Sequence, residues 1–294
     1  MEEPLVHLVD AHIYIFRSWF GMPEMRAPDG AAVEAAFGFT NTLIRYLRDE
    51  EPSHVGVCFD HGLATFRNEI FPGYKQSRGE PPAELEAQFE LCQEAARALG
   101  LQVFSASGYE ADDVIATLVA GVEESARVRV VTADKDLMQL VTEDGRVELY
   151  DLARDRRFDA AAVREKFGVD PAQIPDYLAL VGDSVDDLPG VPGVGRKGAA
   201  AALTAFGSAE AIPADPAAWE SVPARGTRRL AERIAEHRDQ LLRVRELATV
   251  VRDVPGIAAR LDDLAWHGAD RQWIDELYGR LGWGQMATWL PGWA

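Results

Sequence analysis

Residues 128–134 read Val-Arg-Val-Val-Thr-Ala-Asp, an apolar run rich in valine that ends in an acidic residue. Residues 5–10 and 54–60 have the same form, because each is a short apolar segment that ends in an aspartate. Such segments predict strands buried on both faces, as in a parallel sheet that helices cover on both sides. The carboxyl ends of parallel strands meet at one edge of a sheet, so three aspartates should meet there. They are Asp10, Asp60 and Asp134.

Helical patterns alternate with strands over the first half of the chain. The expected helices cover residues 32–48, 82–99, 110–122 and 135–140, and two further strands are expected at 101–104 and 147–152. This alternation predicts an α/β fold with a mostly parallel sheet. From residue 159 to 247 the patterns are helical, broken by Pro- and Gly-rich turns.

The composition is that of a globular protein of ordinary size. The 294 residues are 47% hydrophobic and 27% charged, which allows one large domain or two small ones without disulfides. Two cysteines make no secreted disulfide framework, and the acidic start is not a signal peptide, so a cytoplasmic protein is expected. No apolar run is long enough to span a membrane. A net charge of −18 argues against non-specific coating of nucleic acid but allows a local basic face.

More acidic residues lie close in sequence to the three aspartates. They open the helix expected over 110–122, follow Asp134, and recur in the segment 182–187. Carboxylates gathered at one edge repel one another unless a cation neutralises them, and carboxylate oxygens suit Mg²⁺ or Mn²⁺. Eight or nine carboxylates match two metal ions about 4 Å apart, an arrangement suited to phosphodiester hydrolysis.

Helix capping is the alternative for any single acid. Asp and Glu are favoured at helix starts, so Asp10 or Asp112 could cap a helix without binding a metal. Capping does not explain why so many acids gather at one predicted edge. Histidines near that edge, such as His7 and His12, are expected to be structural.

Positive charge collects in three places. The first consists of Arg67, Lys75 and Arg78, and the second of Arg196 and Lys197. The third, residues 225–245, has seven arginines against three acids. A solvated helix with i,i+4 ion pairs explains this third group as well as phosphate contact does.

The second basic group follows a Gly-rich turn at residues 188–195. Such a turn between helices exposes backbone N–H groups, and the next helix adds a favourable dipole for an anion. Gly193 and Gly195 would permit close approach of a phosphate, although a plain interhelical loop is the alternative. The sequence lacks a Walker A pattern, so a nucleotide-hydrolysing P-loop is not expected. Five tryptophans in residues 266–293 should pack on the main body, with base stacking as the alternative.

Five ordered segments resemble the bacterial 5′–3′ exonuclease/flap endonuclease family, which includes the N-terminal nuclease domain of bacterial DNA polymerase I. They are LVDAHIYIFRSWF (8–20), VCFDHGLATFRNEIFPGYKQSR (57–78), GYEADDVIATL (108–118), VVTADKDLMQLV (130–141) and YLALVGDSVDDLPGVPGVGRKGAAAAL (177–203). The resemblance covers residues 5–290. It implies a PIN-like α/β core over 1–158, with an arch at about 61–88. A helical region with a helix–three-turn–helix element would occupy 159–260, and a C-terminal segment, 261–294, would pack on the core.

The resemblance also implies an activity and its residues. Members cleave 5′ flaps and remove nucleotides from 5′ ends of DNA in replication and repair, using two or more Mg²⁺ or Mn²⁺ ions. The implied metal ligands are Asp10, Asp60, Glu110, Asp112, Asp113, Asp134, Asp136, Asp183 and Asp186. The residues expected to carry catalysis are Lys75, Arg78, Asp10, Asp60, Asp112 and Asp134. Those expected to contact DNA are Arg67, Lys75, Arg78, Gly190, Gly193, Gly195, Arg196, Lys197, Arg225 and Arg228.

Partners follow from the same resemblance. The expected substrates are DNA with a 5′ flap, a 5′ overhang or a nick, and a K⁺ ion could bind the helix–three-turn–helix. A monomeric, stand-alone nuclease in the bacterial cytosol, without a membrane partner, is expected. A catalytically silent DNA-binding protein of the same fold and a PIN-like RNase remain the alternatives.

Overall fold

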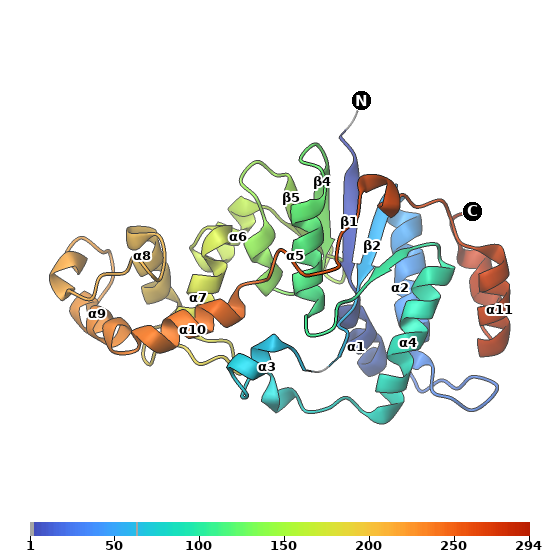
Figure 1. Ribbon diagram of the computed structural model, residues 1–294, viewed down its shortest axis with the longest axis horizontal. Coiled ribbons are helices and arrows are strands. Elements are labelled where there is room, and N and C mark those ends of the chain that lie inside the picture. Colours follow the sequence, from blue (N-terminus) through green and yellow to red (C-terminus); the bar gives the residue numbers. More distant parts are fainter. Residues whose placement is uncertain (1–2, 63) are drawn as a thin grey trace.

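The computed structural model describes residues 3–62 and 64–294 (Figure 1). Within these residues, six strands form one sheet in the order β3-β2-β1-β4-β5-β6, and only the β5–β6 pair is antiparallel. The strands are β1 (Leu5–Asp10), β2 (His54–Cys58), β3 (Gln102–Phe104), β4 (Arg127–Val131), β5 (Val147–Asp151) and β6 (Arg156–Phe158). The predicted α/β fold with a mostly parallel sheet is confirmed.

Two hydrophobic cores lie on the two faces of the sheet. Side chains of β1 and β4 alternate between them, since Val9 and Val131 belong to one core and Leu8 and Val130 to the other. The first core includes side chains of four helices, which are α1 (Ala11–Gly21), α2 (Glu34–Glu50), α4 (Ala83–Ala98) and α11 (Arg271–Leu281). The second contains α5 (Ala111–Gly121) and continues into the helical region. The sheet is therefore covered on both sides, as its apolar strands require.

The helical region extends away from one side of the sheet, at the left of Figure 1. Its helices are α6 (Ala160–Phe167), α7 (Ile174–Val181), α8 (Arg196–Phe206), α9 (Thr227–Glu236) and α10 (Arg238–Ala248). Short helical turns complete the chain: η1 (Gln76–Arg78), η2 (Asp136–Leu140), η3 (Pro171–Gln173), η4 (Pro216–Trp219), η5 (Leu261–Leu264) and η6 (Gly284–Trp289). Over the described residues, no helix is both long and apolar enough to cross a membrane.

Two local features differ from the sequence expectation. Helix α1 was not predicted, because its aromatic and β-branched residues are weak helix formers and the Asp10 side chain makes no capping hydrogen bond with described residues. Strand β6 has only three residues, too few for a periodic signal. The segment 61–88, where an arch is expected, contains α3 (Phe66–Ile70), η1 and the start of α4. Leu63, which also belongs to that segment, lies outside the described residues.

The C-terminal tryptophans mostly pack on the body, as expected. Trp283 is buried and meets Phe37 of α2 edge to face, and Trp266 donates its Nε1–H to the Leu99 carbonyl at 2.8 Å. Trp273 and Trp289 stay partly exposed, at 43% and 40%.

Trp219 should be an anchor of the helical region. Its side chain is 0% exposed, donates Nε1–H to the Pro213 carbonyl at 3.0 Å and contacts Phe206. Replacing Trp219 by Ala would leave a large cavity and lower the free energy of unfolding by about 3–5 kcal/mol. Urea unfolding followed by circular dichroism measures this, and a loss below about 1 kcal/mol would contradict the packing described.

Candidate metal centre and nucleic-acid interface

The three strand-end aspartates meet at the carboxyl edge of the sheet. Asp10 is the last residue of β1, and its carboxylate accepts a hydrogen bond from Thr132 Oγ1 at 2.9 Å. Asp60 Oδ1 accepts the Ala111 N–H at 2.7 Å, which joins β2 to the start of α5. Burial, followed by the charges of Asp60 and Asp134, raises the pKa of Asp10 to about 7. The edge therefore holds mutually repelling carboxylates.

Helix α5 adds two acids to this edge. Burial, with the neighbouring charges of Asp134 and Asp10, raises the pKa of Asp112 well above its ordinary value. Asp112 is therefore part of the same group of carboxylates as the strand-end aspartates. Glu110 is the N-cap residue of α5, and its carboxylate also lies beside Lys75.

A second group of acids gathers beside the first. Asp136 of η2 and Asp183 and Asp186 of the loop after α7 each offer an oxygen, and the three oxygens lie within 4.8 Å of one another. The loop is closed by paired backbone hydrogen bonds between Asp183 and Leu188, at 2.9 and 2.8 Å. Burial, followed by the charge of Asp134, raises the pKa of Asp136 to about 8.

These carboxylates fit a divalent cation. Asp136 Oδ1 is buried and has no hydrogen-bond partner among the described residues, although Lys135 Nζ lies 3.1 Å away as an ion-pair partner. Lys135 also pairs with Asp183, so this single ammonium group does not balance the charge of both buried carboxylates, and a further cation would stabilise the group. The donor set consists only of hard oxygens, which suit Mg²⁺ or Mn²⁺.

Basic side chains line the acidic edge. Lys75, which has a left-handed backbone with φ of 55°, places Nζ 2.6 Å from Glu110 Oε1. Arg78 pairs with Asp186 and donates Nε–H to the Val185 carbonyl at 3.1 Å. Lys135 pairs with Asp183. The structure thus places the expected Lys75 and Arg78 at the acids and adds Lys135.

Two residues expected at the site, Asp113 and Arg67, form a buried ion pair with each other. Asp113 is 0% exposed, and its carboxylate forms a two-pronged ion pair with Arg67 at 2.7 Å for both contacts. Asp113 also accepts the Glu110 N–H at 3.2 Å, as one half of a capping box. The Arg67 side chain is only 2% exposed. The expectations that Asp113 binds metal and that Arg67 touches DNA are therefore corrected, because each satisfies the other inside the protein.

The Gly-rich turn, residues 188–195, follows directly after the loop that carries Asp183 and Asp186, and it ends at α8. A Cβ on Gly190 would lie 2.5 Å from the Gly182 nitrogen, so this glycine is required by close backbone packing. A Cβ on Gly193 would lie 1.5 Å from an Arg233 nitrogen, so Gly193 makes room for that guanidinium. Gly195 has open space beside it, and Arg196 and Lys197 form the first turn of α8. A phosphate could approach the turn at Gly195.

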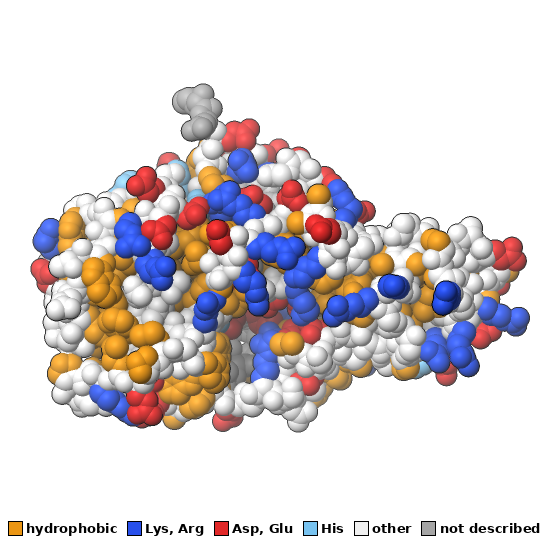
Figure 2. Space-filling view, turned by 180° about the vertical axis from the view of Figure 1, so that it is seen from behind, with side chains coloured by type: hydrophobic (Ala, Val, Ile, Leu, Met, Phe, Trp, Pro, Cys, Tyr) orange, Lys and Arg blue, Asp and Glu red, His pale blue; other side chains and the backbone are white. Residues whose placement is uncertain are grey.

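Two arginines of the third basic group, Arg225 and Arg228, differ in their contacts. Arg228 pairs with Glu232 at 3.1 Å, which is the i,i+4 pairing of a solvated helix. Arg225 lies just before α9, and no ion pair is recorded for it within the described residues. Figure 2 shows Lys and Arg side chains gathered near the middle of one face and along the helical extension at the right. The basic surface therefore reaches from the sheet to the helical region.

Four residues contact the acids but were not among the site residues expected from the sequence. Lys135 stands between Asp134 and Asp136, which was the one local signal available. Tyr74 donates its hydroxyl to Glu110 at 3.0 Å, Thr132 binds Asp10, and His12 Nδ1 accepts the Asp60 N–H at 3.1 Å. His12 thus has the structural role expected of it.

Asp183→Asn should weaken divalent cation binding. The variant removes one charged oxygen from the group formed with Asp136 and Asp186, while its amide oxygen can still accept the Val185 N–H. Titration calorimetry with Mn²⁺ should show an affinity at least tenfold lower, a difference of about 1.4 kcal/mol. Asp49→Asn, an exposed acid on α2, is the matched control. Unchanged Mn²⁺ affinity for Asp183→Asn would contradict the assignment of this group as a metal site.

Comparison with known proteins gives the family. Residues 5–168 match the description "5'-3' exonuclease, N-terminal resolvase-like domain", and residues 169–272 match "5'-3' exonuclease, C-terminal SAM fold". The chain is 40% identical over 285 residues to DNA polymerase I of Mycobacterium leprae and 38% identical to that of Bacillus caldotenax. These matches cover 95% and 96% of this chain but 30% and 32% of the relatives, so the chain spans about a third of their length.

Solved structures share the fold. Zinc-bound T5 5′-exonuclease matches with a TM-score of 0.66 and 21% identity, covering 94% of this chain and 98% of that one. The catalytic core of Rad2 in complex with a DNA substrate matches with a TM-score of 0.63 and 16% identity, covering 98% and 92%. Together with the two adjoining family matches, these similarities show that the chain belongs to the 5′–3′ exonuclease family.

Proposed function

We propose that this protein is a structure-specific 5′ nuclease that hydrolyses phosphodiester bonds of DNA at 5′ flaps, 5′ overhangs and nicks. The observation that carries the proposal is the acidic edge, where carboxylates from the ends of β1 and β4, from α5 and from the loop after α7 lie together. Membership of the 5′–3′ exonuclease family supports it. So does the DNA substrate bound by the similar Rad2 core.

The acids would hold two or more divalent ions, Mg²⁺ or Mn²⁺. Asp136, Asp183 and Asp186 form one candidate group. The other candidates surround Asp10 and are Asp60, Glu110, Asp112 and Asp134. When bound, such ions supply electrostatic stabilisation of a phosphoryl group and activation of water.

Lys75 and Arg78 would contribute positive charge at the scissile phosphate. Both side chains already lie at the acids, and both are carried by the short segment between α3 and α4. A preorganised cation in a partly buried site stabilises developing charge more strongly than one in water. Lys135 would add to this field, because it pairs with Asp183 from the opposite side of the loop.

The helical region would hold the DNA duplex. Gly195, Arg196 and Lys197 are exposed at the end of the Gly-rich turn and the start of α8, where N–H groups of the helix start and the two basic side chains would meet phosphates, with Arg225 as a further basic residue of this region. Such contacts bind phosphates, so the protein should select substrates by shape with little sequence preference. We also propose a K⁺ ion at this turn, a monomer as the active form, and a bacterial cytosolic location.

Cleavage of a 5′-labelled flap DNA tests the proposed function. With Mg²⁺ the wild-type protein should release short products near the flap junction, and EDTA should abolish them. Asp134→Asn should lose activity by about 100-fold or more while it still binds the flap, because its amide oxygen can accept the Asp136 N–H as the carboxylate does. Asp49→Asn serves as the control. Metal-independent binding without cleavage would point to the silent DNA-binding alternative, and preferential cleavage of matched RNA would point to the RNase.

Lys75→Met should lower the turnover number without lowering the affinity for flap DNA. The variant keeps an unbranched side chain, one atom shorter, but removes the charge that lies 2.6 Å from Glu110. The turnover number should fall by about 100–1,000-fold, with little change in the affinity for flap DNA measured in Ca²⁺. An equal loss in affinity and none in turnover would show that Lys75 only holds the DNA.

A further inference from the structure

A buried ion pair connects the two parts of the proposed nuclease. Arg67 Nη1 and Nη2 donate to the two oxygens of Asp113, each at 2.7 Å, and both side chains are buried. We name this pair the latch. Glu110 lies on the metal side of the latch, because Arg67 Nη1 is 3.4 Å from Glu110 Oε2 and Asp113 accepts the Glu110 N–H. Glu110 in turn contacts Lys75 and Tyr74.

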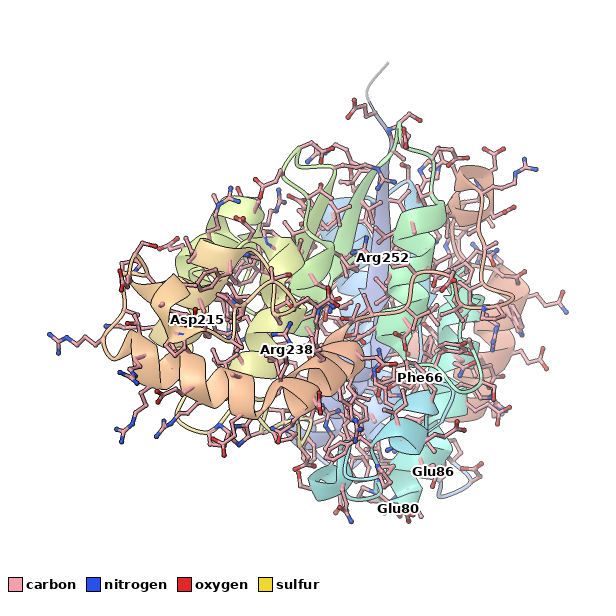
Figure 3. All side chains as sticks on the ribbon, turned by 60° about the vertical axis from the view of Figure 1, so that its left-hand side comes forward. Phe66, Glu80, Glu86, Asp215, Arg238 and Arg252 are labelled. Atoms are coloured by element: carbon pink, nitrogen blue, oxygen red, sulfur yellow. The ribbon has the colours of Figure 1, made fainter. Side chains whose placement is uncertain are left out.

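The remaining donors of Arg67 bind a segment that lies far away in the sequence. Nε donates to the Leu247 carbonyl at 2.8 Å and Nη2 to the Thr249 carbonyl at 3.2 Å, while Asp113 Oδ1 accepts the Val251 N–H at 2.8 Å. We name residues 247–254, which follow and partly overlap the end of α10, the strap. The strap crosses α5 in Figure 1, and Figure 3 shows its residue Arg252 beside α5, above Phe66 of α3.

Two further side chains fix the strap to the core. Gln139 of η2 forms two hydrogen bonds with the strap. Its Nε2 donates to the Ala248 carbonyl at 3.0 Å, and its Oε1 accepts the Val250 N–H at 3.1 Å. Thr117 Oγ1 of α5 accepts the Val254 N–H at 3.1 Å. The backbone of the strap is therefore satisfied by core side chains in place of regular secondary structure.

The strap follows α10, and α10 contacts both the Gly-rich turn and α7. Gln240 of α10 donates to the Gly190 carbonyl at 3.2 Å, and Arg245 binds Asp176 of α7 at 2.7 Å. A path of contacts, partly buried at the turn and buried at the latch, thus runs from the turn, through α10 and the strap, to Arg67, Asp113 and Glu110. Packed elements joined in this way transmit displacement, because interiors have few voids to absorb it.

We propose that the latch sets the position of the cut. It fixes the spacing between the Gly-rich turn, which would hold the duplex, and the acids, which would hold the metal ions, so that one phosphodiester bond reaches the acids. This inference rests on the proposed function. Arg67 is then a positioning residue, and only its planar five-donor group can bind a carboxylate and two carbonyls at once.

Three variants test the latch. Arg67→Lys keeps the positive charge, but an ammonium group cannot reproduce the two parallel hydrogen bonds from the guanidinium to Asp113. Thr117→Val keeps the shape of the side chain but removes the hydroxyl that accepts the Val254 N–H and donates to the Asp113 backbone carbonyl, so it loosens the strap while the side-chain pair of Arg67 and Asp113 stays in place. Arg129→Lys is the matched control, because Arg129 also forms buried ion pairs, with Glu50 and Glu148 at 2.7 Å, but lies in β4 away from the strap.

The first readout is the length of products from a 5′-labelled flap DNA, resolved to single nucleotides with Mg²⁺. The wild-type and Arg129→Lys proteins should cut mainly at one bond, whereas Arg67→Lys and Thr117→Val should spread cleavage over at least one neighbouring bond. A purely structural role for Arg67 would lower the amount of active protein without moving the cut. Cleavage by both variants at the wild-type bond alone would overturn the inference.

The second readout needs neither DNA nor metal. Hydrogen exchange at the Val250 and Val251 amides should be at least tenfold faster in Arg67→Lys than in the wild type, and unchanged in Arg129→Lys. Equal protection in all proteins would also overturn the inference, because the strap would not depend on the latch. The wild-type protein could leave the flap DNA uncut while exchange at these amides is still faster in Arg67→Lys. The proposed function then fails, and the role of the latch in cut position fails with it.

Discussion

Repulsion among buried carboxylates at the carboxyl edge of the sheet is the constraint on which the rest of this structure depends. Asp10, Asp112 and Asp136 all have raised pKa values because each is buried close to other acids. A fold that gathers like charges loses stability unless cations compensate. Lys75, Arg78 and Lys135 compensate in part, and bound divalent ions would complete the compensation.

The stability that permits this crowding comes from elsewhere in the molecule. Two hydrophobic cores cover the faces of the sheet, and the second continues into the helical region. The same continuity places the Gly-rich turn at a defined distance from the acids. The latch between Arg67 and Asp113 lies at the junction, where it satisfies the strap and caps α5 at once. The positions of the charged side chains at the carboxyl edge therefore depend on the packing of the two hydrophobic cores and the latch.

Much of the fold, and the gathering of acids at one edge of the sheet, could be predicted from sequence because both follow simple periodic rules. Apolar strands ending in aspartate predict a parallel sheet with acids at one edge, and the structure has this arrangement. Asp113 could not be separated from Asp112 in this way, since which neighbour turns inward depends on Arg67, 46 positions earlier in the chain. Gly193 was read as room for a phosphate, but the guanidinium of Arg233 lies there. Contacts between distant segments leave no local pattern to read.

Anomalous diffraction from crystals soaked in Mn²⁺ would test the central claim most directly, because it locates the ions without relying on activity. The account predicts at least two Mn²⁺ peaks about 4 Å apart, surrounded by the acids of the carboxyl edge. One peak should contact the group formed by Asp136, Asp183 and Asp186. Peaks absent from this edge at saturating Mn²⁺, or found only against surface acids, would contradict the account.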